Sequence, residues 1–213
     1  MRYACRTGLV AIFSLLVLVG CAPREQVELL RPGAMLAVSG FSQPQSPWEM
    51  MAGYPPVEGY KAPPEVLDRL DEILGEKLHQ QEISFQGPNL THQCEEIVLA
   101  ELEGSRVSAL EYWVRVGRCL PVDYVLVPHL LYWQERQGGE YSVEAPASVV
   151  LDLFLVDVRS GTLAKRFHFD ERQTSLMENL LEAPKFFSRG AKWVSAEKLA
   201  EDGISEGVKE LGL

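Results

Sequence analysis

Positively charged residues are in short supply in this chain. It has 20 lysines and arginines against 30 aspartates and glutamates, a formal net charge of -10 at pH 7. Phosphate backbones repel an acidic protein, so this balance disfavours nucleic-acid binding. No long apolar run follows the first 21 residues, which excludes a polytopic membrane protein. Hydrophobic residues make up 46% of the chain and no repeat is visible, so a disordered or collagen-like chain is excluded.

The sequence also lacks the motifs of common catalytic sites. It contains no Gly-x-Ser-x-Gly elbow, no P-loop and no Gly-x-Gly-x-x-Gly. The histidines are scattered along the chain, at His79, His92, His129 and His168. His168 is followed closely by Asp170 and Glu171, and a surface position at the end of a strand explains it more simply than a metal or general-base role. We therefore expect no catalytic residue, no metal site and no cofactor, and thus not an enzyme.

The first 21 residues, MRYACRTGLVAIFSLLVLVGC, have the organisation of a secretory signal. Arg2 and Arg6 form a basic start, and the apolar run from residue 9 to residue 19 has the length of a signal-peptide core. The run is shorter than the roughly 20 apolar residues that a membrane-spanning helix needs. It is followed by Leu-Val-Gly-Cys at residues 18–21, which resembles the lipobox of bacterial lipoproteins. A plain signal peptide with an incidental cysteine is the alternative.

The resemblance to a lipobox implies that Cys21 is the lipidation site. In that family the thiol is diacylated, residues 1–20 are removed and the new amino terminus is acylated, with chains such as palmitate. Several acyl chains hold a protein firmly on a membrane, since each buried methylene contributes about 0.8 kcal/mol. Ala22 stands where Asp would resemble an inner-membrane retention signal, so we expect an outer-membrane anchor facing the periplasm. Residues 21–33 would be a lipidated tether and residues 34–213 a single periplasmic domain.

Two cysteines remain in the expected domain, Cys94 and Cys119. In an oxidising compartment they could form a disulfide or stay as two separate buried thiols. A bond between them would close a loop of 25 residue steps. The chain-entropy relation gives such a bond roughly 3–4 kcal/mol.

A Pro-rich loop at residues 42–63 is the most unusual segment. Loops longer than about 15 residues are uncommon in compact domains and often have a function. This loop contains Trp48, Tyr54 and Tyr60, which could form a contact with a partner. The alternative is that the loop folds back as a flap over the core.

The remaining elements follow from periodicity and turn residues. We expect strands at 35–38, 82–86, 122–134, 148–158 and 163–169, and helices at 64–80, 90–102, 107–116, 175–181 and from Ser195 onwards. Pro128 implies an unpaired edge or a bulge in its strand. Gly117 is expected to cap its helix, and Gly203 and Gly207 to weaken the last helix by about 1 kcal/mol each. Phe186, Phe187 and Trp193 are expected to plug the core.

Two further observations concern polar groups near the last strands. Asp152 lies inside an apolar strand, so once buried it needs a partner such as Arg166, Arg115 or Arg118, or a raised pKa. The run Phe169, Asp170 and Glu171 mixes charge with aromatic residues after an edge strand. It could form a contact surface with the last two helices, or a solvated corner.

Together these elements predict an α+β fold, with a mixed β-sheet and helices packed mainly on one face. The expected order is β-α-β-α-β-β-β-α-α. Helices separate the early strands, and the later strands form a meander.

Several motifs are similar to one group of envelope proteins. The strand ending in Gly40-Phe41, the amphipathic helix after it, VDYVLV at 122–127 and LFLVDVRSGTL at 153–163 resemble the TolB N-terminal, CsgG and LpoB lipoprotein domains. Pro128, the Pro-rich loop and the tail from Phe167 depart from that pattern, and the tail is more similar to uncharacterised bacterial lipoproteins. The resemblance implies a non-enzymatic envelope protein that acts through protein contacts.

We therefore expect a lipid-anchored assembly factor or adaptor for an envelope complex, in secretion or cell-wall machinery. Its partner would be another envelope protein or its own copies, giving a homo-oligomer. The alternative is a periplasmic carrier of a lipid or small apolar ligand, with the long loop as a lid.

Overall fold

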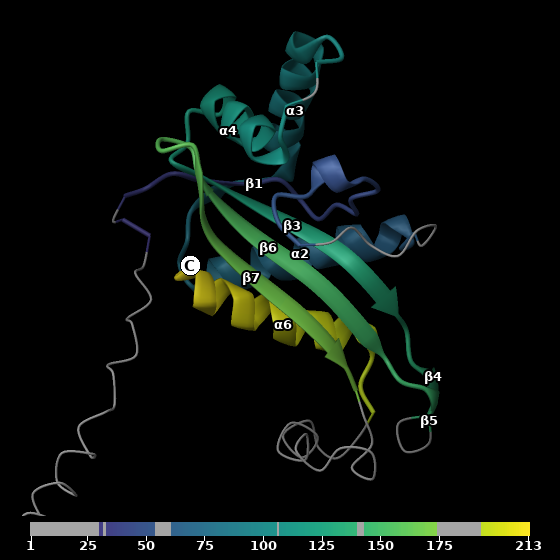
Figure 1. Ribbon diagram of the computed structural model, residues 1–213. Helices are drawn as coiled ribbons and strands as arrows, with labels where there is room; N and C mark the ends of the chain where they lie inside the picture. The colour runs from purple at the N-terminus through teal and green to yellow at the C-terminus, as the bar shows by residue number, and fades with distance from the viewer. Residues whose placement is uncertain (1–29, 32, 54–60, 106, 140–142, 174–192) are drawn as a thin grey trace, which may run out of the picture.

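The computed structural model describes residues 30–31, 33–53, 61–105, 107–139, 143–173 and 193–213 (Figure 1). The elements are β1 (Leu36–Val38), the short 3-10 helix η2 (Pro47–Glu49), α2 (Pro64–Gln80), β2 (Phe85–Gln86), α3 (Pro88–Leu102), α4 (Ala109–Cys119), β3 (Tyr124–Gln134), β4 (Gln137–Gly138), β5 (Val143–Ala145), β6 (Ser148–Asp157), β7 (Thr162–Arg172) and α6 (Ala196–Leu211).

Five strands form one mixed sheet in the order β2-β1-β3-β6-β7. β1 pairs in parallel with both β2 and β3, whereas β3, β6 and β7 form an antiparallel meander. β4 and β5 form a separate two-stranded sheet. The expected α+β class with a mixed sheet is confirmed.

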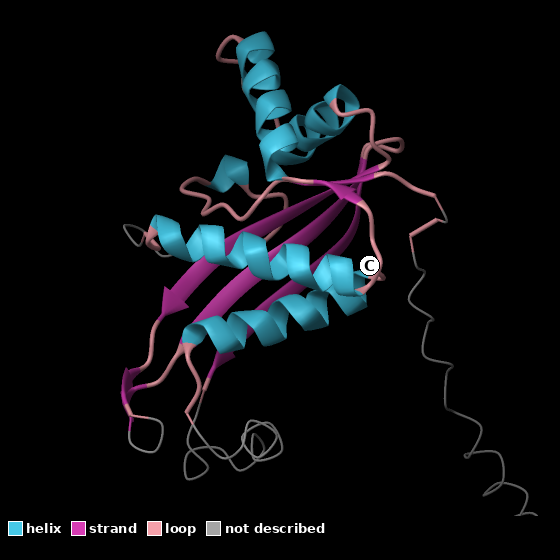
Figure 2. Ribbon diagram, turned by 180° about the vertical axis from the view of Figure 1, so that it is seen from behind, coloured by secondary structure: helices cyan, strands magenta, loops and turns pink. Residues whose placement is uncertain are grey.

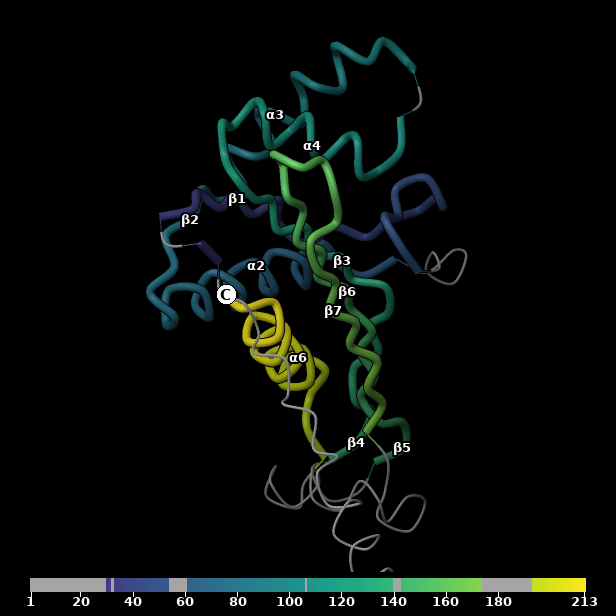
Figure 3. The backbone as a smooth tube through the Cα atoms, turned by 60° about the vertical axis from the view of Figure 1, so that its left-hand side comes forward, coloured from purple at the N-terminus to yellow at the C-terminus, as the bar shows by residue number. Residues whose placement is uncertain are grey.

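One face of the sheet, which we call the inner face, is covered by α2 and α6 (Figure 2). Figure 3 shows both helices on the same side of the strands. Apolar residues at helical spacing in α2, including Leu70, Leu74 and Leu78, are fully buried there. Alternate residues of β6, such as Leu151 and Leu153, meet them from the sheet.

The opposite face, the outer face, has a second core at one end only. There α3 and α4 pack on Val125, Val127 and Val156. Figure 1 shows these two helices at one end of the sheet, and the described part of the chain has no further α-helix on this face. Loop residues, among them Met51 and Ala52, also pack on this face.

Three glycines have roles that differ from the predicted ones. A Cβ at Gly203 would lie 2.7 Å from the ring of Phe169, and one at Gly207 would lie 2.5 Å from a methyl of Leu153. These glycines let α6 approach the sheet closely. The cost of their low helix propensity is therefore offset by closer packing of α6 on the sheet. Gly117 does not cap its helix: α4 continues to Cys119, and Gly117 packs against Val125 of β3 and Val158, the residue after β6.

Pro128 is accommodated by the shortness of β1. It pairs with Leu153 of β6 in register, and the bulge in β3 lies farther along, between Leu130 and Tyr132. On its other side β1 has already ended, and the Pro128 carbonyl accepts a hydrogen bond from the Ser42 backbone N–H at 3.2 Å. The missing N–H therefore costs no ladder bond with β1.

The predicted boundaries of α2 are confirmed, and Ser195 caps α6 by accepting from the Lys198 N–H. Val143–Ala145 form β5, a short strand that is not among the expected ones. The predicted helix at 175–181, Phe186 and Phe187 lie outside the described residues, as does the signal segment. None of the described helices is long and apolar enough to span a membrane.

Candidate functional site

The outer face contains a buried ion pair that the sequence predicted. Asp152 in the centre of β6 is completely buried, and the guanidinium of Arg166 on β7 bonds to both of its carboxylate oxygens at 3.0–3.2 Å. Nδ1 of His168 lies 2.8 Å from Oδ1 of Asp152. His168 is thus paired with Asp152, not with the carboxylates that follow it in sequence. The pairing with Arg166 confirms the first of the three predicted partners.

A second histidine, His129 on β3, lies on the other side of Asp152 from β7. It lies opposite Asp152 in the β3–β6 register and is 2% exposed. Its ring packs edge-on against Phe154, with centroids 5.3 Å apart. Burial lowers the pKa of His129 to about 4, although the nearby Asp152 carboxylate opposes that shift. His129 is therefore a neutral imidazole at pH 7.

The first part of the Pro-rich loop is seated on this face. Ser42 forms a parallel bridge with His129, and the Ser42 carbonyl accepts a hydrogen bond from the Leu130 N–H at 2.9 Å. At the far end Gly53, with φ of +86°, lies so close to the outer face that a Cβ would be 2.7 Å from Arg166. Met51 and Ala52 pack against the outer core. The described part of the loop is thus a flap, although Trp48 within it is 57% exposed.

A cavity of about 430 Å³ opens between this flap, α3, α4 and β3. The flap supplies Trp48, Gln43 and Pro44, and His129 comes from β3. The helical side consists of Leu99, Leu102, Ser105, Val107, Ala109, Tyr112 and Trp113. Trp113 and Tyr112 contact one another edge to face, with ring centroids 5.1 Å apart. The size and apolar lining are typical of small-ligand sites.

The helical wall of this cavity is fixed by a disulfide. Cys94 of α3 is bonded to Cys119, the last residue of α4, with their Cα atoms 5.8 Å apart. Of the two alternatives that the sequence left open, the structure has the disulfide. It joins the two helices directly, so their relative position does not depend on side-chain packing alone.

The predicted contact residues do not form one site. Trp48 is exposed at the cavity, whereas Tyr54, Tyr60 and the predicted lipidation site Cys21 lie outside the described residues. Phe169 is buried against Gly203 in the inner core, so its prediction as a contact residue is wrong. It lies in β7 itself, and alternation points it inward. Asp170 is exposed and Glu171 is half-buried.

Exposed apolar side chains are concentrated elsewhere than the sequence suggested. Five large ones are at least half exposed in the described part of the chain: Met35, Trp48, Leu90, Ile97 and Leu99. Three of them belong to α3. Apolar periodicity does not predict this surface, because apolar residues on several sides of a helix are typical of a buried helix.

Among the described residues, no group of three or more histidine, cysteine or acidic side chains is placed to hold a metal ion. The polar groups on the outer face are the Asp152–Arg166 ion pair and the imidazoles of His129 and His168 beside it. The Arg166 guanidinium, engaged with the buried carboxylate, supplies neither a nucleophile nor a proton acceptor.

No protein-family model matches the chain, and no curated protein matches it. Among solved structures, a variant PelC dodecamer from Paraburkholderia phytofirmans is similar, with 14% identity and a TM-score of 0.50 over 88% of this chain and 94% of that one. The LpoB C-terminal domain from Salmonella enterica is 12% identical with a TM-score of 0.38, over 76% of this chain and 93% of that one. Lipoprotein GNA1162 from Neisseria meningitidis is 11% identical with a TM-score of 0.40, over 74% and 96%. The PelC likeness shows a common fold.

Proposed function

We propose that this protein is a lipid-anchored component of the bacterial cell envelope, held at the outer membrane and facing the periplasm. There it acts as a non-enzymatic adaptor through contacts with another envelope protein. The observation that supports the adaptor role is the exposed apolar surface of α3. Leu90 and Ile97, seven residues apart and so on the same side of the helix, are each 50% exposed; Leu99, 59% exposed, lies on the opposite side, at the cavity. Apolar side chains gathered on one exposed element are typical of protein-binding surfaces.

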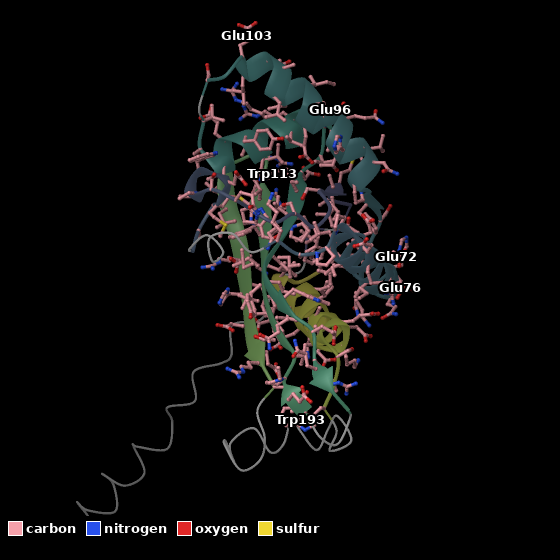
Figure 4. All side chains as sticks on the ribbon, turned by 90° about the vertical axis from the view of Figure 1, so that its right-hand side faces the viewer. Glu72, Glu76, Glu96, Glu103, Trp113 and Trp193 are labelled. Atoms are coloured by element: carbon pink, nitrogen blue, oxygen red, sulfur yellow. A yellow bond between two sulfur atoms is a disulfide. The ribbon has the colours of Figure 1, made fainter. Side chains whose placement is uncertain are left out.

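The charge of α3 indicates the chemistry of the partner. Between Pro88 and Leu102 the helix has three glutamates and no lysine or arginine, and Glu103 follows directly. In Figure 4, Glu96 and Glu103 mark this helix at the end of the molecule opposite Trp193. An acidic surface with apolar side chains between the charges complements a basic surface with an apolar groove. We therefore propose a partner with such a surface.

Photo-crosslinking in cells tests the proposal directly. A benzophenone amino acid replaces Ile97 on α3 in one strain and Glu76, exposed on α2, in a control strain. Captured proteins are identified by mass spectrometry. The adaptor role predicts a specific envelope protein at position 97 and none at 76. Equal capture at both positions, or none at either, would contradict it.

A Cys21→Ala variant of the crosslinking strain tests the anchor. Loss of the thiol removes the acceptor of the diacylglyceryl group, so metabolic labelling with palmitate should disappear and capture at position 97 should fall. Palmitate incorporation that persists in Cys21→Ala would place the lipid elsewhere and overturn the assignment of Cys21.

A second candidate function is favoured by the cavity under Trp48. A chain that holds a site of about 430 Å³ with aromatic walls could carry a lipid or a small apolar ligand. Native mass spectrometry of the purified chain tests carriage. A stoichiometric co-purified lipid or apolar compound supports the carrier, and a clean protein contradicts it.

A further inference from the structure

Two buried side-chain nitrogens in the described part of the chain lack a hydrogen-bond partner, Nδ1 of His129 and Nε2 of Gln43. Both residues line the cavity between the flap, α3 and α4. Buried polar atoms without a partner are rare and cost about 1–3 kcal/mol each in general. Their meeting at one cavity indicates a site whose polar groups are completed by something that binds there.

The fold brings these two residues together by a specific contact. They are 86 positions apart in sequence, and the bridge between Ser42 and His129 sets the flap beside β3. The orientation of the Gln43 amide is fixed as well, because its Oε1 accepts a hydrogen bond from the Ala62 N–H at 2.9 Å. Because Oε1 is the acceptor, the Nε2–H group of Gln43 is the donor that lacks a partner.

The lining limits the chemical class of the ligand. The cavity walls include no lysine or arginine, and Glu49 is the charged residue among them. Its carboxylate already accepts from the Gln45 N–H at 2.8 Å. An anionic ligand would find no lysine or arginine here, and a cation would find only the Glu49 carboxylate, which is already engaged. Trp48, Tyr112 and Trp113 instead offer flat apolar faces suited to a ring.

We propose that this cavity binds a small neutral ring compound with a carbonyl or amide group, which accepts a hydrogen bond from Gln43 Nε2 and pairs with His129 Nδ1. The proposal rests on the second candidate function and gives it a ligand class. The ring lies between Trp48 of the flap and Trp113 of α4. The partly exposed Trp48 and Leu99 form the entrance.

Benzamide and toluene are matched probes, since both have one benzene ring and only benzamide has an amide. The full chain, held in lipid nanodiscs, is labelled with 5-fluorotryptophan, and its four tryptophans report separately by fluorine NMR. Benzamide should shift the resonances of Trp48 and Trp113 in a saturable way, with a dissociation constant of about millimolar for so small a ligand. Trp133 and Trp193, which do not line the cavity, should not move.

Substitutions then test the two nitrogens. Gln43→Glu keeps an oxygen that can accept a hydrogen bond from the Ala62 N–H, but it removes the Nε2–H donor. Benzamide should therefore bind about five- to tenfold more weakly to this variant than to the parent. Toluene should bind both proteins with affinities within about twofold of each other. His129→Phe keeps a ring and should shift preference from benzamide towards toluene. Gln93→Glu is the matched control, because it adds the same charge at an exposed position on α3 outside this cavity.

Unchanged Trp133 and Trp193 resonances in each unliganded variant confirm that it is folded, and His129→Phe suffices if Gln43→Glu does not fold. Equal shifts of all four tryptophans, no saturable shift, or unchanged benzamide affinity in both variants would overturn the site. Carriage is judged separately by the co-purified compound. A clean protein that still binds benzamide through Gln43 would remove the carrier function and leave the site.

Discussion

Gly75 and Gly203 are both glycines inside helices, but only one of them has a neighbour where its Cβ would be. The nearest atom to a Cβ at Gly75 is 3.9 Å away, an ordinary contact. At Gly203 three atoms of the Phe169 ring lie within 2.9 Å. The propensity cost of glycine is the same at both sites, so the difference between them measures packing alone.

Alanine at these two positions should therefore change stability in opposite directions. We expect Gly203→Ala to lower the free energy of unfolding by about 1–3 kcal/mol, because the new methyl overpacks the inner core. Gly75→Ala should raise it by about 0.5–1 kcal/mol through the restricted unfolded chain. Urea denaturation of both variants gives the comparison. A stabilising Gly203→Ala would mean that α6 can move away from the sheet at no cost.

His129 should make the stability of the protein depend on pH. Its pKa is about 4 in the folded state and near 6.5 when exposed, so between these values the unfolded chain binds more protons. The free energy of unfolding should therefore decrease as the pH falls from 6.5 to 4, by about 3 kcal/mol. His129→Phe removes this contribution, whereas His92→Phe at an exposed position keeps it.

Urea denaturation at several pH values between 4 and 7 checks this dependence. Asp71 acts in the opposite direction, because burial raises the pKa of its carboxyl to about 6, but it is common to all three proteins. The difference between the parent and His129→Phe therefore isolates the histidine. Parallel pH profiles for these two proteins would show that His129 is protonated without cost in the folded state.

At the scale of elements, the sequence predicted what local patterns control. The apolar periodicity of α2, the β-rich runs of β3 and β6 and the Ser195 cap are local features, and the structure confirms them. The partner of Asp152 could be narrowed to three arginines because a buried carboxylate needs a cation. Strand pairing then selects Arg166, on the adjacent β7.

The rest depends on contacts between distant segments. From the sequence, His129 is one of four scattered histidines and Gln43 is part of a loop. No local pattern predicts that they line one cavity, because nothing local indicates that Ser42 bridges to β3. Phe169 was predicted as the last residue of its strand, but β7 continues to Arg172. Phe169 therefore lies inside the strand, and strand alternation points its side chain into the core. The close approach of α6 at Gly203 depends on the position of the sheet. Helix propensity gives no information about that position.

The disulfide should stabilise one element pair more than the rest of the fold. It closes a 25-residue separation that contains most of α3 and all of α4, for which the chain-entropy relation gives roughly 3–4 kcal/mol. A Cys94→Ala/Cys119→Ala variant should lose about that much unfolding free energy. Hydrogen exchange should accelerate first in α3 and α4, while amides of β6 and β7 keep most of their protection. Uniform acceleration across the sheet would mean that the helical pair and the sheet unfold as one unit.

At the scale of the whole molecule, net charge distinguishes two kinds of partner. Copies of a chain with a formal net charge of -10 repel one another, and salt screens that repulsion. A basic partner is attracted to the acidic α3, and salt weakens that attraction. The Debye length falls from about 10 Å at 0.1 M salt to about 3 Å at 1 M. Both the repulsion between copies and the attraction to a basic partner should therefore change over this range of salt.

Crosslinking from position 97 in isolated envelopes at increasing salt should therefore separate self-association from adaptor binding. If the partner is a basic envelope protein, its crosslink to α3 should weaken between 0.1 and 1 M salt, and any self-crosslink should strengthen or stay constant. The position 76 control should remain without product throughout. A self-crosslink that dominates and grows with salt would indicate that α3 joins copies of this chain, and would replace the adaptor with a homo-oligomer held together by Leu90 and Ile97.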